Sequence, residues 1–201
     1  MAGRPVSPKA FATRFQETIA EIRHLHGQAG HQAISISSRR IKWSVYELAH
    51  IRLMSAWEDT LQHIFLRQLV ADTTQIQALY GLAAPPRISL GVARAILDHP
   101  DAQVLSWSDW GRVKARAARL LPPTSTFLST SPPPHLQDMT KVRNACAHPR
   151  GEAYDRFLAI VQGPKQGWRP GRFLCQVTTV PPRSRADDYL DELDTVVQRL
   201  V

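Results

Sequence analysis

The sequence predicts a mainly α-helical fold: a compact helical bundle with room for one small β-hairpin in its C-terminal third. Apolar residues recur every three or four positions over most of the 201 residues, which is the spacing of helices with one buried face. Prolines and glycines gather at a few places, where they would end helices. We therefore expect a single domain over residues 1–201, with residues 150–201 as a C-terminal extension.

The first helix is predicted over residues 8–26. Ser7 is a suitable N-cap, and Pro8 takes the first helical position, where its missing N–H costs nothing. The buried stripe of this helix would consist of Phe11, Phe15, Ile19, Ile22 and Leu25. The polar, Ser-rich segment 27–40 that follows is expected to be a loop.

The strongest helical pattern begins at Ser44 and ends near residue 71. Ser44 and Glu47 match a capping box, in which each side chain accepts a hydrogen bond from the other residue's backbone N–H. One broad apolar face then follows, formed by Leu53, Trp57, Leu61, Ile64, Phe65 and Leu69. This pattern predicts a long helix in the core.

Three shorter helices are predicted over residues 74–80, 89–97 and 108–121. Gly81 ends the first of them, because glycine readily adopts the left-handed conformation of a helix C-terminus. An irregular, loosely structured loop rich in Pro, Ser and Thr is expected over residues 122–134.

The last third of the chain begins with a predicted helix over residues 135–147. Residues 152–161 fit a helix or a strand, and residues 172–180 have strand-like composition. If both are strands, the segment between them is the loop of a hairpin. Ser184 and Asp187 then cap a final helix near the C-terminus.

The chain is strongly basic. It contains 25 Lys and Arg against 17 Asp and Glu, which gives a formal net charge of +8. This excess favours a polyanionic partner, nucleic acid first, although a charged surface that serves only solubility explains it equally well. A basic surface is expected on the predicted helix 108–121, from Arg112, Lys114, Arg116 and Arg119.

The cysteines and the hydropathy pattern predict the compartment. Cys146 and Cys175 form neither a disulfide framework nor a CxxC pair, so a reducing interior is the simplest context. The N-terminus lacks the apolar core of a signal peptide, and no apolar run reaches 18 residues. We therefore expect a cytoplasmic protein with no membrane partner.

Residues 143–148, which read RNACAH, concentrate the side chains that handle phosphates. Arg143 is a planar cation that can clamp a phosphate, and His148 can exchange a proton near neutral pH. Asn144 and His148 lie four positions apart and share a helix face. Arg143 and His148 diverge by about 140° on a regular helix.

Two arrangements would overcome this divergence. Pro149 disfavours helical backbone at His148, so that the ring can turn at a helix end. Alternatively, two copies of the helix facing each other would bring two Arg143 and two His148 side chains into one cleft. Taken singly, Arg143 also fits a surface cation near a helix C-terminus, and His148 fits a C-terminal cap.

The hexapeptide resembles the signature of the HEPN superfamily, Arg-x4–6-His, commonly with a polar residue after the Arg and often Ala before the His. The segment YELAHIRLMSAWEDTLQHIFLRQL is also similar to the long second helix of those domains, so that the resemblance covers roughly residues 45–148. HEPN domains are helical bundles that typically dimerise through the motif helices. Many are metal-independent ribonucleases of toxin–antitoxin, phage-defence or RNA-processing systems.

The resemblance implies a catalytic set of Arg143, Asn144 and His148, acting on RNA that supplies its own 2′-hydroxyl nucleophile. His148 would be the general base or acid, Arg143 would stabilise charge on the phosphate, and Asn144 would hold the imidazole or a phosphate oxygen. Lys141 and the basic residues Arg112, Lys114, Arg116 and Arg119 would bind the RNA backbone. No metal and no cofactor is required.

We therefore predict a homodimeric endoribonuclease that leaves 2′,3′-cyclic phosphate ends and serves as a toxin or antiviral effector. Its partners would be RNA and a neutralising antitoxin or regulatory protein. Two other hypotheses remain open. One is a non-catalytic HEPN-like module that binds nucleic acid or a nucleotide, or that only dimerises. The other is a helical scaffold whose charge is incidental.

Overall fold

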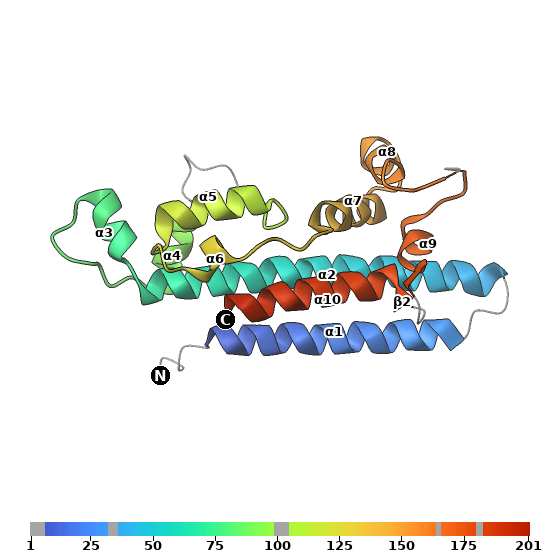
Figure 1. Ribbon diagram of the computed structural model, residues 1–201, viewed down its shortest axis with the longest axis horizontal. Helices are drawn as coiled ribbons and strands as arrows, with labels where there is room; N and C mark the ends of the chain where they lie inside the picture. Colours follow the sequence, from blue (N-terminus) through green and yellow to red (C-terminus); the bar gives the residue numbers. More distant parts are fainter. Residues whose placement is uncertain (1–6, 32–35, 99–104, 164–165, 180–182) are drawn as a thin grey trace. The chain divides into compact units, whose positions relative to one another are not determined.

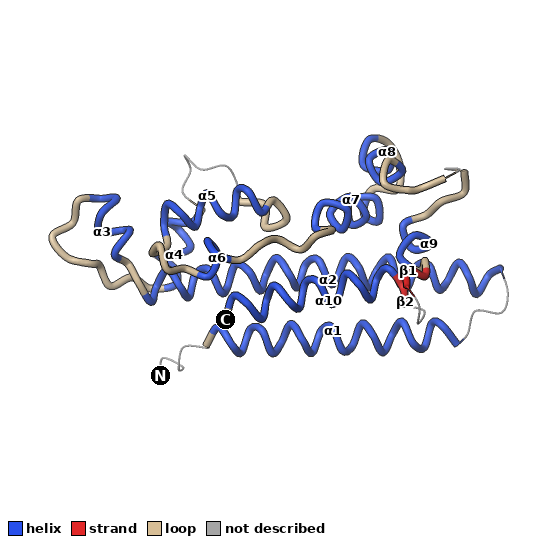
Figure 2. The backbone as a smooth tube through the Cα atoms, in the orientation of Figure 1, coloured by secondary structure: helices blue, strands red, loops and turns tan. Residues whose placement is uncertain are grey.

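The computed structural model describes residues 7–31, 36–98, 105–163, 166–179 and 183–201 (Figure 1). Helices make up most of these residues, and the strands among them form a single short antiparallel pair (Figure 2). The predicted mainly α fold class is confirmed. No helix among the described residues is long and apolar enough to cross a membrane.

In chain order, the helices and strands are α1 (Pro8–His31), α2 (Ile36–Ala71), α3 (Thr74–Tyr80), α4 (Leu90–Leu97), α5 (Trp110–Leu120), α6 (Thr126–Ser129), α7 (Leu136–Ala147), α8 (Glu152–Leu158), α9 (Pro170–Leu174), β1 (Val177–Thr179), β2 (Arg183–Ser184) and α10 (Arg185–Leu200).

The chain divides into two compact units. Unit 1 comprises the described parts of residues 1–14, 58–132 and 196–201, and unit 2 comprises those of residues 15–57 and 133–195. The long helices α1, α2 and α10 contribute to both units. The basic helix α5 belongs to unit 1, and α7, which carries the RNACAH motif, belongs to unit 2.

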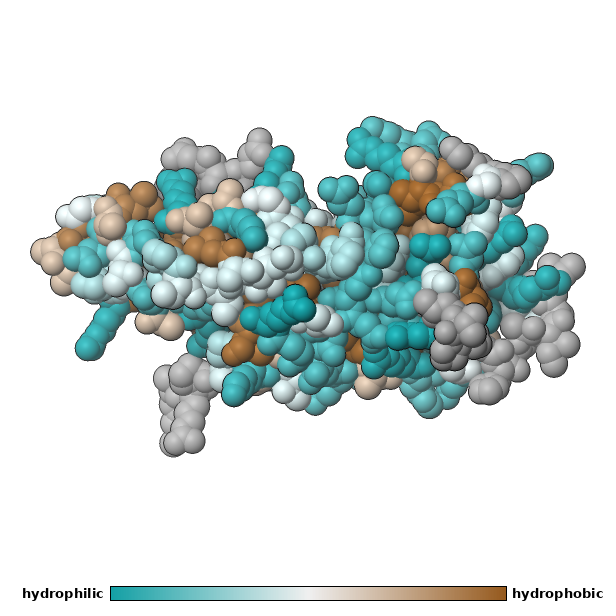
Figure 3. Space-filling view, viewed as in Figure 1, coloured by the Kyte–Doolittle hydropathy of each residue, from teal (hydrophilic) through white to brown (hydrophobic). Residues whose placement is uncertain are grey.

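In unit 2, α1, α2 and α10 lie side by side (Figure 1). The Phe15 ring of α1 lies 6.3 Å from the Trp57 ring of α2, and the His50 ring of α2 lies 6.0 Å from the Tyr189 ring of α10. Helix α7 buries one face in this unit, through Leu136, Met139, Val142 and Ala145. The visible surface over α10 is mostly hydrophilic (Figure 3), as expected for the outer side of an amphipathic helix.

In unit 1, the segment predicted to be a loose loop contributes to the core. The Phe127 ring of α6 is fully buried and meets the Phe65 ring edge-on, with 5.3 Å between centroids. The Ser125 hydroxyl donates a hydrogen bond of 2.7 Å to the side chain of Gln68. The prediction for residues 122–134 was therefore wrong in part, because Phe127 fixes a segment whose composition resembles a loop.

The predicted loop over residues 27–40 was also wrong. Residues 27–31 end α1 and residues 36–40 begin α2, while residues 32–35 lie outside the described part of the chain. The segment is polar because its described side chains, such as Arg39 and Arg40, face solvent and not because its backbone is irregular.

The capping box predicted at Ser44 and Glu47 does not exist, because α2 begins at Ile36 and both residues lie in its interior. Glu47 finds another partner, since its Oε1 accepts a 3.0 Å hydrogen bond from the backbone N–H of Gly171. The apolar face predicted for this helix is confirmed, and Ala71 ends it as expected.

The C-terminal third contains more helix than its composition indicates. Residues 152–161 fitted either a helix or a strand, and residues 152–158 form the helix α8. The strand prediction for residues 172–180 is confirmed for β1 and wrong for residues 172–176, and residue 180 lies outside the described residues. Before β1, Pro170 occupies the first helical position of α9, and Phe173 and Leu174 are buried. The partner of β1 is β2, not residues 152–161.

The capping box predicted at the start of α10 is confirmed. The Asp187 backbone N–H donates to the Ser184 hydroxyl oxygen at 3.2 Å, and the Ser184 backbone N–H donates to the Asp187 carboxylate at 3.1 Å. The shorter helices α3, α4 and α5 also form close to the predicted positions. Gly81 ends α3 with a left-handed φ of 61°.

Candidate active site at the end of α7

Helix α7 is held at its start by α10. His135 precedes the helix, and its backbone N–H and ring Nδ1 contact the two carboxylate oxygens of Glu192 at 3.0 and 2.6 Å. Met139, Val142 and Ala145, spaced three apart, are fully buried. Arg143 and Asn144 therefore lie at the boundary between core and solvent, where both are half-buried.

The three predicted catalytic residues are all placed at the C-terminal end of α7. Arg143 Nη1 donates a 3.2 Å hydrogen bond to Oδ1 of Asn144. The helix ends at Ala147, and the backbone N–H of His148 donates to the Asn144 carbonyl oxygen at 2.8 Å. Asn144 thus contacts both of the other residues, through its side chain and through its backbone.

His148 has left the helical conformation, with φ −131° and ψ 81°. This agrees with the prediction that the following Pro149 disfavours helical backbone at this position. The His148 side chain is exposed, and no hydrogen bond or ion pair to its ring is found among the described residues. Asn144 was expected to hold either the imidazole or a phosphate oxygen. Its carboxamide oxygen instead accepts the hydrogen bond from Arg143.

A second histidine, His50, lies behind this site and was not singled out in the sequence. It is buried, and its Nε2–H donates a 2.9 Å hydrogen bond to the Met139 carbonyl oxygen of α7. The pKa of His50 is lowered to about 4, mainly by burial; the hydrogen bond to the Met139 carbonyl oxygen opposes this shift, and the nearby charges of His26 and Arg143 add to it. His50 is therefore neutral at pH 7. Its position, three before Leu53 in the apolar stripe of α2, could have indicated a core residue.

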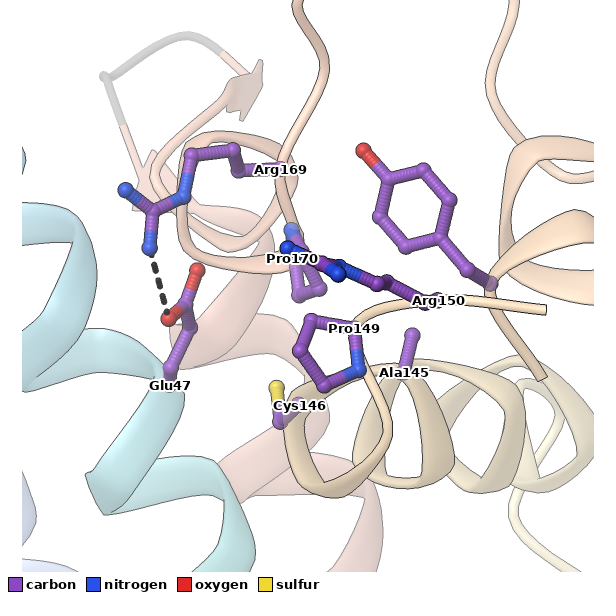
Figure 4. Close-up of a pocket in the computed structure, with 8 residues that line it drawn as sticks. Glu47, Ala145, Cys146, Pro149, Arg150, Arg169 and Pro170 are labelled. Atoms are coloured by element: carbon purple, nitrogen blue, oxygen red, sulfur yellow. Dashed lines mark hydrogen bonds and ion pairs between the residues drawn. The ribbon is translucent and has the colours of Figure 1, made fainter.

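A cavity of about 330 Å³ opens beside the end of α7 (Figure 4). Its lining comes from four segments of unit 2: Glu47, Ala145, Cys146, Pro149, Arg150, Tyr154, Arg169 and Pro170. The Glu47 carboxylate accepts the Gly171 backbone N–H at 3.0 Å and lies 3.4 Å from Arg169 Nη2. This cavity was missed in the sequence because its residues are distributed over positions 47 to 170.

Cys146 lies within the motif and also lines this cavity. Burial raises the pKa of its thiol to about 12, and the Glu47 carboxylate contributes to the increase. The thiol is therefore protonated at neutral pH. This state does not fit a thiolate nucleophile, so we interpret Cys146 as a small helix residue.

The basic residues of α5 lie in unit 1 and are described apart from the motif. Arg112, Arg116 and Arg119 share one helix face and line a groove of about 330 Å³ with Leu105 and Ala115. Lys114 is not part of this lining, because on a helix it points about 200° away from Arg112. The sequence predicted a basic surface formed by all four residues, and in the structure three of them line one groove.

Several of these cations already have protein partners. Arg112 Nε lies 3.2 Å from the carboxylate of Asp109, and Arg116 donates to the Leu97 carbonyl oxygen. On α7, Lys141 Nζ lies 3.1 Å from the carboxylate of Asp138. The Arg112–Asp109 pair is exposed, and exposed ion pairs are weak, at about 0 to 1 kcal/mol, so this pair does not prevent Arg112 from binding phosphate.

Neither a metal site nor a relative identifies the chain. Within the described ranges, His, Cys, Asp and Glu side chains form no group of three that could hold a metal ion. Comparison of the chain with protein-family models, with curated proteins and with solved structures finds no match.

Proposed function

We propose that this chain is a metal-independent endoribonuclease of HEPN type, with Arg143, Asn144 and His148 as its catalytic set. The observation that carries the proposal is that one helix end holds both the exposed imidazole of His148, which makes no hydrogen bond or ion pair within the described part of the chain, and the Arg143–Asn144 hydrogen bond of 3.2 Å. An imidazole and a guanidinium at the same helix end supply the proton transfer and the charge stabilisation that phosphodiester cleavage requires.

In the proposed reaction the 2′-oxygen of the RNA attacks the adjacent phosphorus. Neutral His148 accepts the 2′-hydroxyl proton while the O2′–P bond forms. The P–O5′ bond breaks, and the leaving 5′-oxygen takes a proton from an acid. The products are a 2′,3′-cyclic phosphate and a 5′-hydroxyl, and no external oxidant, reductant or metal enters the balance.

Arg143 would bind the non-bridging oxygens of the scissile phosphate and stabilise the charge that develops on them. A guanidinium already oriented for the transition state needs little rearrangement during the reaction. Asn144 supports this role by accepting the hydrogen bond of Arg143. In a homodimer, which we propose on the basis of the family resemblance, His148 of the second copy would be the acid.

Arg112, Arg116 and Arg119 line one groove of α5, and they would contact RNA phosphates together with Lys114 and Lys141. Such contacts position the RNA but do not read its sequence. The biological role that fits is a toxin or antiviral effector, restrained by a separate antitoxin or regulatory protein.

The test is cleavage of end-labelled RNA in EDTA by the wild-type protein and by Arg143→Ala and His148→Ala variants. We expect 2′,3′-cyclic phosphate ends from the wild type and a loss of at least about 100-fold in rate for each variant. Matched controls are His24→Ala and Arg156→Ala, which remove an exposed histidine and an exposed, Glu152-paired arginine outside the motif.

One alternative function is favoured by the arginine-lined groove of α5, which can bind a polyanion without cleaving it. A non-catalytic module of this kind would bind RNA and leave it intact, and His148→Ala would not change its affinity. Cleavage that survives both Arg143→Ala and His148→Ala would reject the proposed catalytic set.

A further inference from the structure

The cavity of unit 2 begins where the proposed catalytic set ends. Pro149 and Arg150, the two residues after His148, both line it. Two residues of extended chain span at most about 7 Å, so the backbone of Arg150 lies within that distance of His148. A ligand in the cavity would thus lie close to the backbone of His148, whose own side chain is not among the residues that line the cavity.

The polar lining of this cavity is cationic on balance. Arg150 is exposed, and within the described part of the chain its guanidinium makes no hydrogen bond or ion pair. Arg169 is 44% exposed, and its 3.4 Å contact with Glu47 leaves most of its donors available. Two guanidinium groups against one carboxylate favour an anionic ligand, and their planar forks match phosphate oxygens.

The side chains differ in what they already bind. In Figure 4, Arg169 turns toward Glu47, whereas Arg150 extends from the connection between α7 and α8 toward Pro170. Arg150 is therefore the cation that can bind a ligand without first giving up a protein partner.

The rest of the lining suits the apolar parts of a nucleotide. Pro149, Pro170 and Ala145 supply apolar walls, and Tyr154 adds a half-buried aromatic ring. The Tyr154 hydroxyl donates to the Trp168 carbonyl oxygen, which fixes the ring. A volume of about 330 Å³ accommodates one nucleotide, not an extended strand, and lies at the lower end of small-ligand pockets.

One wall of the cavity is held rigidly. A Cβ added to Gly171 would lie 2.1 Å from the Trp43 carbonyl oxygen, so α9 lies directly against the backbone of α2. The 3.0 Å hydrogen bond from the Gly171 N–H to Glu47 fixes the same contact. A preformed wall lowers the entropic cost of binding a ligand.

We propose that this cavity binds the nucleotide next to the scissile phosphate of the RNA, with Arg150 and Arg169 on the phosphate of that nucleotide. The proposal rests on the proposed function, because it deepens that function into a substrate subsite. It assigns to Arg150 a binding role and no part in proton transfer.

The test uses RNA that cannot be cleaved. A fluorescein-labelled 2′-O-methyl-RNA pentamer lacks the nucleophile, so its affinity is measured by anisotropy without turnover. We expect Arg150→Ala to weaken binding by about 10-fold and to lower the salt slope by about 1, because one phosphate contact is lost. Arg150→Lys should keep the salt slope, and the control Arg156→Ala should change neither quantity. Thermal melting checks that each variant is folded.

A second series locates the phosphate. One linkage of the pentamer at a time is replaced by a neutral methylphosphonate. At one position, the neutral linkage should weaken binding to the wild-type protein by about as much as the Arg150→Ala substitution weakens binding of the unmodified pentamer. The same neutral linkage should weaken binding to the Arg150→Ala variant by little more. A subsite is rejected if no position shows this coupling, or if wild-type protein does not bind the pentamer.

These outcomes separate the two proposals. Coupling at Arg150 without any cleavage of natural RNA would reject the nuclease and keep the nucleotide site. Cleavage that depends on His148, with Arg150→Ala unchanged in affinity and salt slope, would keep the nuclease and reject the subsite.

Discussion

The guanidinium of Arg143 donates a 3.2 Å hydrogen bond to the side-chain oxygen of its neighbour Asn144. Consecutive residues of a helix point about 100° apart and do not normally face each other. The long Arg143 side chain therefore bends toward Asn144, which limits its orientation. The same Asn144 accepts the backbone N–H of His148, so that one residue connects the cation and the proposed base.

Replacement of Asn144 by Ala should slow RNA cleavage by about 10- to 100-fold, because Arg143 loses an acceptor that helps to orient it. Single-turnover rates measure this effect, and RNA affinity should stay within about 2-fold. Thr140→Ala is the matched control, because the Thr140 hydroxyl lies one turn earlier on α7 and, among the described residues, binds the Leu136 carbonyl oxygen alone. Equal rates for Asn144→Ala and wild type would show that the hydrogen bond is irrelevant to catalysis.

Gly171→Ala should destabilise the fold by about 2 kcal/mol, because the new Cβ would meet backbone atoms of Trp43 that cannot move aside easily. Gly27→Ala is the control, since Gly27 lies inside α1 and the added Cβ would have no atom within 4 Å apart from its chain neighbours and the backbone of its own helix. It should stabilise the protein by about 0.5 to 1 kcal/mol through helix propensity. Urea unfolding of both variants gives the comparison, and a neutral Gly171→Ala would contradict the close contact.

His50 should make folding stability depend on pH between 6.5 and 4. Burial lowers its folded pKa from the ordinary 6.5 to about 4, so in this window the unfolded chain binds more protons. Stability is thus present in full above pH 6.5 and falls as the pH decreases toward 4, by about 3 kcal/mol in total. Asp187 contributes only at lower pH, because the nearby His26 ring and the Ser184 cap hold its pKa at about 2.

Urea unfolding of wild type and His50→Gln at pH 7 and pH 4.5 measures how much His50 contributes to the pH dependence of the unfolding free energy. The glutamine amide can still donate to the Met139 carbonyl oxygen but does not titrate. Between pH 7 and pH 4.5, the unfolding free energy of wild type should fall by more than that of His50→Gln. A difference independent of pH would mean that His50 does not titrate in this window.

Ser184→Ala should cost about 1 kcal/mol, because it removes the hydroxyl that accepts the backbone N–H of Asp187 at the start of α10. Ser44→Ala should cost nothing or stabilise slightly, because Ser44 lies inside α2 and alanine is the better helix former. Thermal melting of the two variants distinguishes a real capping box from a sequence that only resembles one. Equal losses would contradict the position of Ser44 inside α2.

The comparison of these two serines shows why local sequence succeeded at one helix start and failed at the other. Ser184 precedes a helix that no upstream residue extends. Ser44 follows eight residues of α2, and the first five of them, residues 36–40, belong to the polar segment that was predicted to be a loop. A polar stretch of sequence indicates only that its side chains are exposed to solvent. Both a loop and the exposed face of a helix have such side chains, so the composition does not distinguish them.

The sequence by itself determined the helical class, the apolar face of α2, the helix that carries RNACAH, and its end at His148. Each of these follows from interactions between residues close in the chain: the spacing of apolar side chains, and the steric effect of Pro149 on the residue before it. Only the tertiary structure decided the partner of Glu47, the helical form of α9, the neutral state of His50 and the arginine-lined cavity. These depend on contacts between residues up to 124 positions apart, as between Glu47 and Gly171, and no local pattern records which of the distant segments will meet.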